Sequence, residues 1–417
     1  MEKKITVSEL RVGMHLLRLE GSWINHPFWR TRFVIDDPRT LAQVHESGVR
    51  ECWIDTSLGL DVDAARVPPP SPPAASPAPA PAPASAPAAA HVAVAGQDFE
   101  AELREAAAVC NRSRRAVIAM FGEARMGRTL DAEACLPLVE DITQSVMRNP
   151  GALVSLARLK TRDDYTYMHS VAVCALMVAL GRRIGLSETE CRDAGQAGLL
   201  HDIGKALMPL EVLNKPGKLT DAEFGVMRSH PVRGHELLQQ GRAATAAALD
   251  VALHHHERVD GTGYPHRLSG EHLQRLARMG AICDVHDAIT SNRPYKAGWD
   301  PATSIARMAG WKGHFDTTLF AAFVQSLGIY PTGSLVRLES QRIAVVAQQN
   351  EAALTAPVVV AFYSLRSAMP ITPQRLDLSR PGAQDRIIAR EDVPQGHYGR
   401  VDELWAEPEL VKTMRAG

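Results

Sequence analysis

Between about residue 98 and residue 329, apolar positions recur with the 3.6-residue period that is typical of amphipathic helices. The clearest predicted helices cover residues 100–123, 131–147 and 170–184. A periodic segment of this length predicts a mainly α fold for the central part of the chain.

Two capping boxes predict where further helices begin. Ser187 and Thr220 each stand three positions before a glutamate, so that the hydroxyl and the carboxylate can bond each other's backbone N–H groups. The helix after Ser187 is expected to run up to His201, and the helix after Thr220 is expected to carry His230.

Both ends of the chain have a different pattern. Short apolar or alternating runs typical of strands occur at residues 5–10, 14–19, 33–35 and 49–54, and again at 334–338, 343–348 and 358–363. A helix is predicted to begin at Pro38 and to end at Gly48. These patterns predict a small α+β domain at the N-terminus and a small β extension at the C-terminus.

The segment 67–90 holds 10 of the 27 prolines, with alanine and serine between them. Such a composition cannot form a core and favours extended polyproline conformations. The chain is therefore divided into five parts: an α+β domain (1–64), a Pro/Ala-rich linker (65–97), a helical connecting region (98–150), a helical bundle (151–331) and a β-containing extension (332–417).

Composition excludes several functional classes. The net charge is −1 and the pI about 7.0, so no basic field is available to bind nucleic acid. No run of about 18 apolar residues occurs, which argues against membrane insertion. The six cysteines form no CxxC pair, a usage that fits a reducing cytoplasm better than a disulfide framework.

Histidine is concentrated in one segment. Seven of the 16 histidines fall between His169 and His256, several of them next to acidic residues. Any one of them alone would be read as an ordinary structural or surface residue. Imidazole and carboxylate together bind first-row divalent ions, and such ions generate hydroxide near neutral pH. The cluster therefore indicates a hydrolytic metal site.

Five motifs follow one another in this region. They are Tyr-Thr-Tyr-Met-His-Ser at 165–170, His-Asp-Ile-Gly-Lys at 201–205, His-Pro at 230–231, His-His-Glu-Arg-Val-Asp-Gly-Thr-Gly-Tyr-Pro at 255–265, and Cys-Asp-Val-His-Asp-Ala-Ile-Thr at 283–290. In this order they resemble the HD-GYP family, helical metal phosphodiesterases that hydrolyse the bacterial messenger cyclic di-GMP. The segment before the linker resembles the small uncharacterised domain that often precedes HD-GYP domains. The resemblance implies an HD-type helical bundle for residues 151–331.

The resemblance also implies which residues bind metal. One divalent ion would be held by His169, His201, Asp202 and Asp284, and the other by Asp202, His230, His255 and His256. A hydroxide bridging the two ions would attack the phosphorus atom. Iron and manganese are the metals common in the family, although the same ligands would accept zinc, nickel or cobalt. Tyr165 stands where some members have a glutamate that helps to hold a third ion, so two ions are expected.

Further residues are assigned by the same resemblance. Asp202 and Lys205 would be catalytic, with Lys205 neutralising phosphate charge or protonating the leaving group. Arg293 and Lys296 resemble the phosphate-binding pair of the family, and Tyr264 lies in the loop that borders the guanine site.

Three other positions near these motifs are less clear. Arg267 replaces a usual glycine in the loop around Tyr264, where it would reshape the pocket or contact phosphate. Asp287 is interpreted as structural, holding the loop before Arg293, with service to a metal ligand as the alternative. Glu257 is either an acceptor that orients an imidazole or an exposed acid.

The resulting hypothesis is a cyclic di-GMP phosphodiesterase that forms pGpG and, by a second cleavage, GMP. Two alternatives stay open. One is a signalling adaptor that binds the nucleotide or a diguanylate cyclase with little turnover, and the other is an HD-type hydrolase of other nucleotides such as another cyclic dinucleotide or (p)ppGpp. The helices between residues 98 and 147 could pair across a homodimer or pack on the bundle.

Overall fold

The structure is a computed structural model of the 417-residue chain. It describes residues 2–19, 33–35, 38, 41, 45, 51–62, 99–159, 165–215, 217–291, 298–350, 352–391 and 397–416. The chain divides into two units, Met1–Gly96 and Gln97–Gly417. In the described part of the chain, no helix combines the length and the apolar character needed to cross a bilayer.

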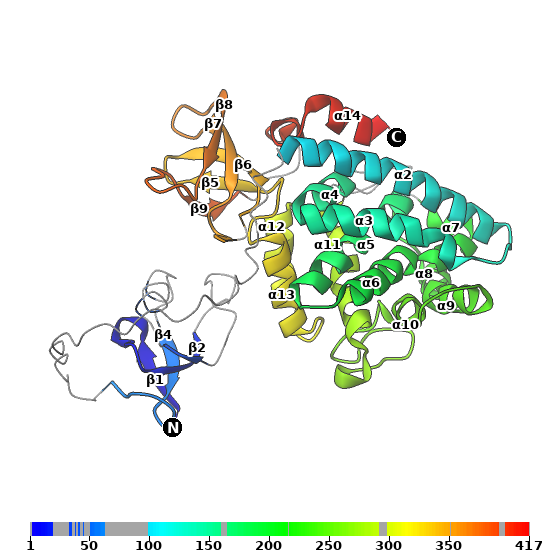
Figure 1. The fold of residues 1–417 in the computed structure, drawn as a ribbon, viewed down its shortest axis with the longest axis horizontal. Helices are drawn as coiled ribbons and strands as arrows, with labels where there is room; N and C mark the ends of the chain where they lie inside the picture. Colours follow the sequence, from blue (N-terminus) through cyan, green and yellow to red (C-terminus); the bar gives the residue numbers. More distant parts are fainter. Residues whose placement is uncertain are drawn as a thin grey trace, which may run out of the picture. The chain divides into compact units, whose positions relative to one another are not determined.

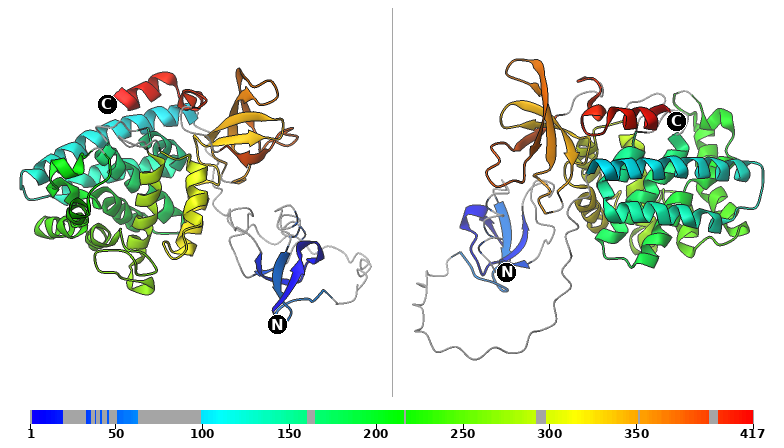
Figure 2. Two further views of the ribbon diagram at one scale, coloured as in Figure 1. Left: turned by 180° about the vertical axis from the view of Figure 1, so that it is seen from behind. Right: turned by 45° about the horizontal axis from the view of Figure 1, so that its top comes forward.

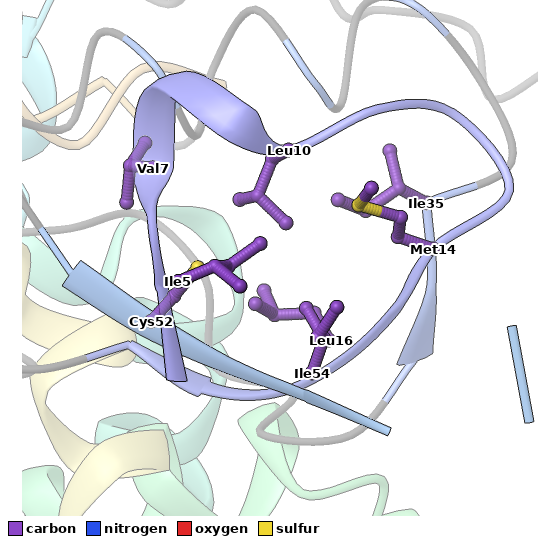
Figure 3. Close-up of a cluster of buried hydrophobic side chains, with 8 residues drawn as sticks. All are labelled: Ile5, Val7, Leu10, Met14, Leu16, Ile35, Cys52 and Ile54. Carbon is purple, nitrogen blue, oxygen red and sulfur yellow. The ribbon is translucent and has the colours of Figure 1, made fainter. Parts of the chain in front are cut away.

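The first unit contains an antiparallel sheet with the strand order β1-β4-β2-β3. Its strands are β1 (Glu2–Thr6), β2 (His15–Leu19), β3 (Phe33–Val34) and β4 (Glu51–Asp55). Alternate residues of β4, Cys52 and Ile54, point into a small core (Figure 3). The other members of this core are Ile5, Val7, Leu10, Met14, Leu16 and Ile35.

One predicted strand in this unit is wrong. Residues 7–9 form a 3-10 helix, η1 (Val7–Glu9), in place of the second half of the strand predicted at 5–10. The reason is local: Glu9 accepts hydrogen bonds from the backbone N–H and the hydroxyl of Thr6 at 2.8 Å each, which closes a turn. The predicted helix between Pro38 and Gly48 falls mostly outside the described residues.

The second unit is a helical bundle followed by a sheet (Figure 1). Its helices are α2 (Phe99–Arg125), η3 (Ala132–Cys135), α3 (Leu136–Arg148), α4 (Pro150–Ala157), α5 (Tyr165–Arg183), α6 (Glu188–Leu200), η4 (Ile203–Leu207), α7 (Leu210–Leu213), α8 (Asp221–Met227), α9 (His230–Gln240), α10 (Ala246–His254), η5 (Gly270–His272), α11 (Arg275–Thr290), α12 (Pro301–Ala309) and α13 (Thr317–Leu327).

Helix α5 is the centre of the bundle. Its residues from Met168 to Gly181 are all buried, and it contacts α2, α3, α4, α6, α11 and α13. A helix that is apolar on all sides is expected only where other helices surround it. Because His169, the first of the predicted metal ligands, lies in α5, its side chain is held by a helix that is buried on all sides. A change such as Leu176→Ala should cost about 2–5 kcal/mol of stability.

The predicted helix starts at Ser187 and Thr220 are confirmed, because both capping boxes are formed. The expectation that the second of these helices carries His230 is wrong. Helix α8 ends at Met227, and α9 begins at His230 with Pro231 in its first turn. A proline lacks the N–H that a continuing helix would need, whereas the first turn of a new helix does not use it. The predicted helix at 131–147 likewise divides into η3 and α3.

The C-terminal sheet is antiparallel with the strand order β8-β7-β6-β5-β9. The three predicted strands correspond to β5 (Leu335–Leu338), β6 (Arg342–Gln348) and β7 (Val358–Ser364). Strands β8 (Met369–Asp377) and β9 (Ile387–Arg390), the 3-10 helix η6 (Val401–Leu404) and helix α14 (Pro408–Ala416) lie in the tail that the sequence pattern left unassigned. Most residues of β8 are exposed, so its sequence lacks the apolar residues from which a strand could be predicted.

Polar contacts connect this extension to the bundle. Asp300 caps α12 by accepting from the Thr303 backbone N–H at 3.0 Å, and its other oxygen accepts from the Leu335 backbone N–H at 2.9 Å. Helix α14 lies along α2 (Figure 2). Glu407, which directly precedes α14, forms an ion pair with Arg104 of α2. The predicted class, a mainly α protein with small sheets towards both ends, is confirmed.

Candidate metal centre

The seven predicted ligands come from five separate segments of the bundle and meet in one place. His169 lies in α5, His201 ends α6 with Asp202 directly after it, His230 begins α9, His255 and His256 follow α10, and Asp284 lies in α11. Six of them are buried, and only the side chain of His256, 23% exposed, reaches solvent. The bundle thus brings together residues that are as much as 115 positions apart in the sequence.

Asp202 lies between two groups of nitrogen donors. Its Oδ2 is 3.5 Å from His169 Nε2 and 3.4 Å from His201 Nε2. Its Oδ1 is 3.2 Å from His230 Nε2 and 3.7 Å from His255 Nε2. Each carboxylate oxygen therefore faces a different pair of imidazoles, which is the arrangement that a carboxylate bridging two ions requires.

Asp284 lies close to histidines of both groups. Its Oδ1 lies 3.0 Å from His169 Nε2 and 3.9 Å from His201 Nε2. Its Oδ2 lies 3.7 Å from His256 Nδ1. Two sets of ligand atoms are close enough to hold an ion: His169, His201 and Asp202 form one, and His230, His255 and His256 form the other.

The four most buried histidines are oriented by acceptors on their other ring nitrogen. The Nδ1 atoms of His201, His230 and His255 lie 2.7, 2.8 and 3.0 Å from the backbone carbonyls of Gly198, Met227 and Val251. An Nδ1–H that donates to a carbonyl leaves Nε2 with its lone pair, directed at the two carboxylates. This is the usual way in which a protein fixes the tautomer of a metal-binding histidine.

His169 is held in the same way by a carboxylate. Its Nδ1 lies 2.6 Å from Oδ2 of Asp287. This contact supports the alternative of service to a predicted metal ligand, and the loop-holding interpretation also has support, because Oδ1 of Asp287 accepts from the hydroxyl of Ser291 at 3.3 Å. Asp287 stands three positions after Asp284 in α11, so both carboxylates face His169.

Charge inside the cluster is set by burial and by the close pairs. Burial opposes ionisation of both carboxylates. Nevertheless Lys205 and His201 hold the pKa of Asp202 well below its usual range. His169 and His256 do the same for the pKa of Asp284. Burial keeps the pKa of His255 well below its ordinary value and lowers the pKa of His256 to about 3, with His230 adding to both shifts. Two charged carboxylates and neutral imidazoles are the forms that bind a divalent ion.

Two buried atoms of the cluster fit a bound ion directly. Among the described residues, His201 Nε2 and Asp202 Oδ1 are buried and have no hydrogen-bond partner. Buried polar atoms are normally paired, because leaving one unpaired costs about 1–3 kcal/mol. Both atoms point into the centre of the cluster, where a metal ion would satisfy them. The donors are nitrogen and oxygen without thiolate, a set that suits iron, manganese and similar ions.

Comparisons with known proteins agree with this geometry. The chain matches a family described as a domain of unknown function (DUF3391) over residues 2–135 and the HD domain over residues 144–319. It is 51% identical over 412 residues to a cyclic di-GMP phosphodiesterase of Pseudomonas aeruginosa, covering 97% of this chain and 96% of that protein. The chain belongs to the HD-GYP phosphodiesterase family. The prediction of the family from its five motifs is therefore confirmed.

Two further relatives match less than half of the chain. A cyclic di-GMP phosphodiesterase response regulator of Xanthomonas campestris is 41% identical over 181 residues, which are 42% of this chain and 47% of that protein. A 3'3'-cGAMP-specific phosphodiesterase of Vibrio cholerae is 36% identical over 163 residues, 39% of this chain and 31% of that protein. Relatives of the HD-GYP domain thus include proteins named for two different cyclic dinucleotides.

The Gly-Tyr-Pro segment folds back onto the histidine cluster. The backbone N–H of Tyr264 donates to the carbonyl of His256 at 3.2 Å, and the Tyr264 ring stacks on the His256 ring with the centroids 4.8 Å apart. Gly263 permits this approach, since a Cβ there would lie 2.4 Å from the Cα of Glu257. Burial raises the pKa of Tyr264, so its phenol stays neutral.

The remaining predicted residues are placed as follows. Lys205 forms a hydrogen-bonded ion pair with Oδ2 of Asp202. Arg267 is exposed and has φ of +57°, a left-handed conformation that favours the glycine usual in HD-GYP domains. Arg293 and Lys296 lie outside the described residues.

Neither prediction for Glu257 is correct. The side chain is 2% exposed, and its Oε1 accepts from the backbone N–H of His266 at 2.6 Å. Its role is to hold the Gly-Tyr-Pro loop, which follows it by a few residues. The pattern His-His-Glu by itself gives no sign of this contact, because the partner is a backbone group nine positions away.

Proposed function

We propose that the protein hydrolyses cyclic di-GMP to pGpG at the histidine and aspartate cluster, with GMP as the product of a second cleavage. The observation that carries the proposal is the position of Asp202, whose two oxygens face two separate groups of histidines. A pair of metal sites sharing one carboxylate suits in-line displacement at phosphorus. The 51% identical relative is named a cyclic di-GMP phosphodiesterase and matches nearly the whole chain.

Two divalent ions, iron or manganese, are proposed to bind there. Their ligands would be His169, His201, Asp202 and Asp284 for one ion and Asp202, His230, His255 and His256 for the other. When bound, such ions supply Lewis-acid activation of the phosphodiester and of the attacking water. Tyr165 stacks parallel to the ring of His169 with the centroids 5.9 Å apart, and it offers no carboxylate for a third ion.

The chain's own side chains would handle the substrate around this centre. Lys205 lies beside Asp202 and is positioned to neutralise charge on the phosphate or to protonate the departing ribose oxygen. The Tyr264 ring, stacked on His256, borders the place where a guanine base would lie. Arg267, Arg293 and Lys296 are proposed as contacts to the substrate on the strength of the family resemblance.

The N-terminal unit and the spacer are proposed to be regulatory or tethering parts of the chain. Residues 1–64 would be a regulatory domain, 65–97 a spacer, 98–150 a connecting region, 151–331 the catalytic domain and 332–417 an extension that supports it. A diguanylate cyclase as partner and a homodimer remain predictions. A cytoplasmic location also remains a prediction, and it is supported by six cysteines that are all buried as thiols.

The test is anaerobic purification, metal analysis and chromatography of the products from cyclic di-GMP. About two iron or manganese ions per chain and formation of pGpG would support the proposal. Asp202→Ala should lose metal and turnover, whereas Asp141→Ala, an exposed carboxylate paired with Arg112, should keep both. Tight binding of cyclic di-GMP without hydrolysis would favour an adaptor, and faster hydrolysis of 3'3'-cGAMP would contradict the substrate assignment.

A further inference from the structure

An arginine that no motif identified lies over the Gly-Tyr-Pro loop. Arg228 follows α8 directly and stands two positions before His230. Its backbone N–H donates to the carbonyl of Phe224 at 2.8 Å, which fixes the start of its side chain. The guanidinium carbon lies 4.5 Å from the centroid of the Tyr264 ring and 5.9 Å from that of Phe224.

Arg228 is the outer layer of a stack that begins at the metal cluster. The Tyr264 ring lies on the His256 ring at an interplanar angle of 28°, and the guanidinium of Arg228 lies over Tyr264. Cation–π contacts of this kind hold a guanidinium by its face, with a stabilisation of about 0.5–2 kcal/mol. The N–H groups at the edge of the guanidinium are not used by that contact. Arg228 is therefore held in place and can still bind an anion.

The neighbouring cations are engaged elsewhere. Lys205 pairs with Asp202, and Arg258, whose charge also acts on the Tyr264 phenol, donates to the hydroxyl of Thr262 at 3.5 Å. In the described part of the chain, no carboxylate forms an ion pair with Arg228, whose side chain is exposed. A fixed arginine at the edge of an anion-binding site is suited to bidentate recognition of phosphate, which a lysine cannot provide in the same geometry.

We propose that Arg228 binds a phosphoryl oxygen of the cyclic dinucleotide, and that the Tyr264 ring positions it for this contact. The inference rests on the proposed function. A cyclic dinucleotide has two phosphodiesters, and only one of them can lie over the metal ligands at a time. Arg228 lies two ring layers away from that place, so it contacts the phosphodiester that is not being cleaved. It thereby favours substrates that have a second phosphodiester over those with one.

The experiment compares three variants of the full, metal-loaded chain. Arg228→Met keeps an unbranched apolar stem but removes the charge, and Arg228→Lys keeps the charge without the planar fork. Arg233→Met removes an exposed arginine of α9 that pairs with Glu236 and serves as the control. The readouts are kcat and KM for cyclic di-GMP, the metal content, and the rate on bis(p-nitrophenyl) phosphate, a small ester with one phosphodiester group.

The expected result is a rise in KM for cyclic di-GMP of about 10-fold or more in Arg228→Met, as the loss of a charge-assisted contact predicts. The rise should be smaller in Arg228→Lys and absent in Arg233→Met. The rate on bis(p-nitrophenyl) phosphate and the metal content should not change. An unchanged KM, or a parallel fall in metal content and in both rates, would overturn the proposal, because the second pattern indicates a structural role.

A failure of the proposed function gives a different pattern. In that case the unmutated protein cleaves bis(p-nitrophenyl) phosphate but leaves cyclic di-GMP intact. Equilibrium binding of cyclic di-GMP to the same variants then decides the role of Arg228. Weaker binding by Arg228→Met supports the contact, and equal binding contradicts it.

Discussion

The Nδ1 atom of His169 lies 2.6 Å from Oδ2 of Asp287, while Nε2 of the same ring lies 3.0 Å from Oδ1 of Asp284. The two aspartates stand one turn apart on α11 and hold one imidazole from both sides. Burial opposes the charged form of His169, but the two carboxylates outweigh burial and raise its pKa. Of the two, Asp284 faces the cluster and Asp287 faces away from it, so Asp287 orients the ring without competing for the ion.

Removing Asp287 should weaken metal binding without removing a ligand. In Asp287→Ala the Nδ1–H of His169 loses its acceptor, and metal affinity should fall about 10- to 100-fold. Asp287→Asn should have a smaller effect, because its amide oxygen can still accept that hydrogen bond. The measurement is metal retained during dialysis against a graded series of chelator concentrations. Asp250→Ala is the control, since Asp250 holds the non-ligand His254 at 2.8 Å. Equal retention by all variants would contradict the role.

Gly204 is predicted to tolerate no side chain. A Cβ at this position would lie 2.0 Å from the carbonyl oxygen of His230 and 2.5 Å from the backbone nitrogen of Gly234. Because both neighbours are backbone atoms, Gly204→Ala must separate η4, which follows Asp202, from α9, which begins with His230. We expect a loss of stability of about 3 kcal/mol, at the upper end of the range for overpacked sites because backbone atoms cannot move aside easily, together with lower metal content.

Gly225→Ala is the matched control for Gly204→Ala. Gly225 lies within α8, and nothing lies within 4 Å of its added Cβ. Alanine in a helix interior is favoured over glycine by about 1 kcal/mol, so this variant should be slightly stabilised. Thermal unfolding followed by circular dichroism, with metal analysis of the same samples, distinguishes the two. Similar midpoints for both variants would show that η4 and α9 can move apart at little cost.

The ligands could be found from the sequence because their chemistry is carried by residue type and order. His169, His201 and Asp284 are ordinary residues singly, and become informative only as members of ordered motifs. Asp287 belongs to one of these motifs, yet its role depends on the rotation of α11 about its axis. Arg228 lies outside all the motifs, and only the fold places it over Tyr264.

The same distinction applies to the fold. Helix starts with a capping box, such as Ser187, could be predicted because the signal lies within four residues. The separate start of α9 could be missed because Pro231 is equally compatible with a first turn or with an interruption. Strand β8 pairs with β7 but buries little, so its residues lack the alternation that marks a strand. Such a strand is specified by its partner and not by its own pattern.

His314 should make the stability of the metal-free protein depend on pH. Burial, together with the nearby Arg258, lowers the pKa of this ring from 6.5 to about 4 in the folded protein. The unfolded chain therefore takes up a proton that the folded one does not, and the stability present above pH 6.5 is lost as the pH falls towards 4. Because the ring is partly solvated, the loss should be about 1 kcal/mol.

The measurement is the midpoint of urea unfolding at several pH values between 4 and 6.5, in the presence of chelator. His314→Gln should lose less stability than the parent protein over this interval, because glutamine does not titrate. His272→Gln, at an exposed position, should follow the parent. Parallel curves for the parent and His314→Gln would show that His314 is protonated equally in both states.

Asp316, outside the cluster, should contribute to stability in two ways, because each of its carboxylate oxygens makes a different contact. Its Oδ1 accepts from the backbone N–H groups of Thr318 and Leu319 at 2.9 Å and caps α13, and its Oδ2 pairs with Arg278 of α11 at 2.6 Å. Asp316→Ala removes both contacts and leaves a half-buried arginine, at an expected cost of about 2–4 kcal/mol. Asp316→Asn keeps the cap and loses the ion pair, so about half of that cost is expected.

Arg275→Met provides the comparison for Asp316, because Arg275 lies on α11 like Arg278, the partner of Asp316, and forms an exposed pair with Glu190 at 3.6 Å. Exposed pairs contribute about 0–1 kcal/mol, so this variant should unfold almost as the parent does. Urea unfolding of all three variants in the presence of bound metal provides the test. If Asp316→Asn is as stable as the parent while Asp316→Ala is not, the cap alone stabilises α13. In that case the contact with Arg278 contributes nothing to holding α13 against α11, the helix that carries Asp284.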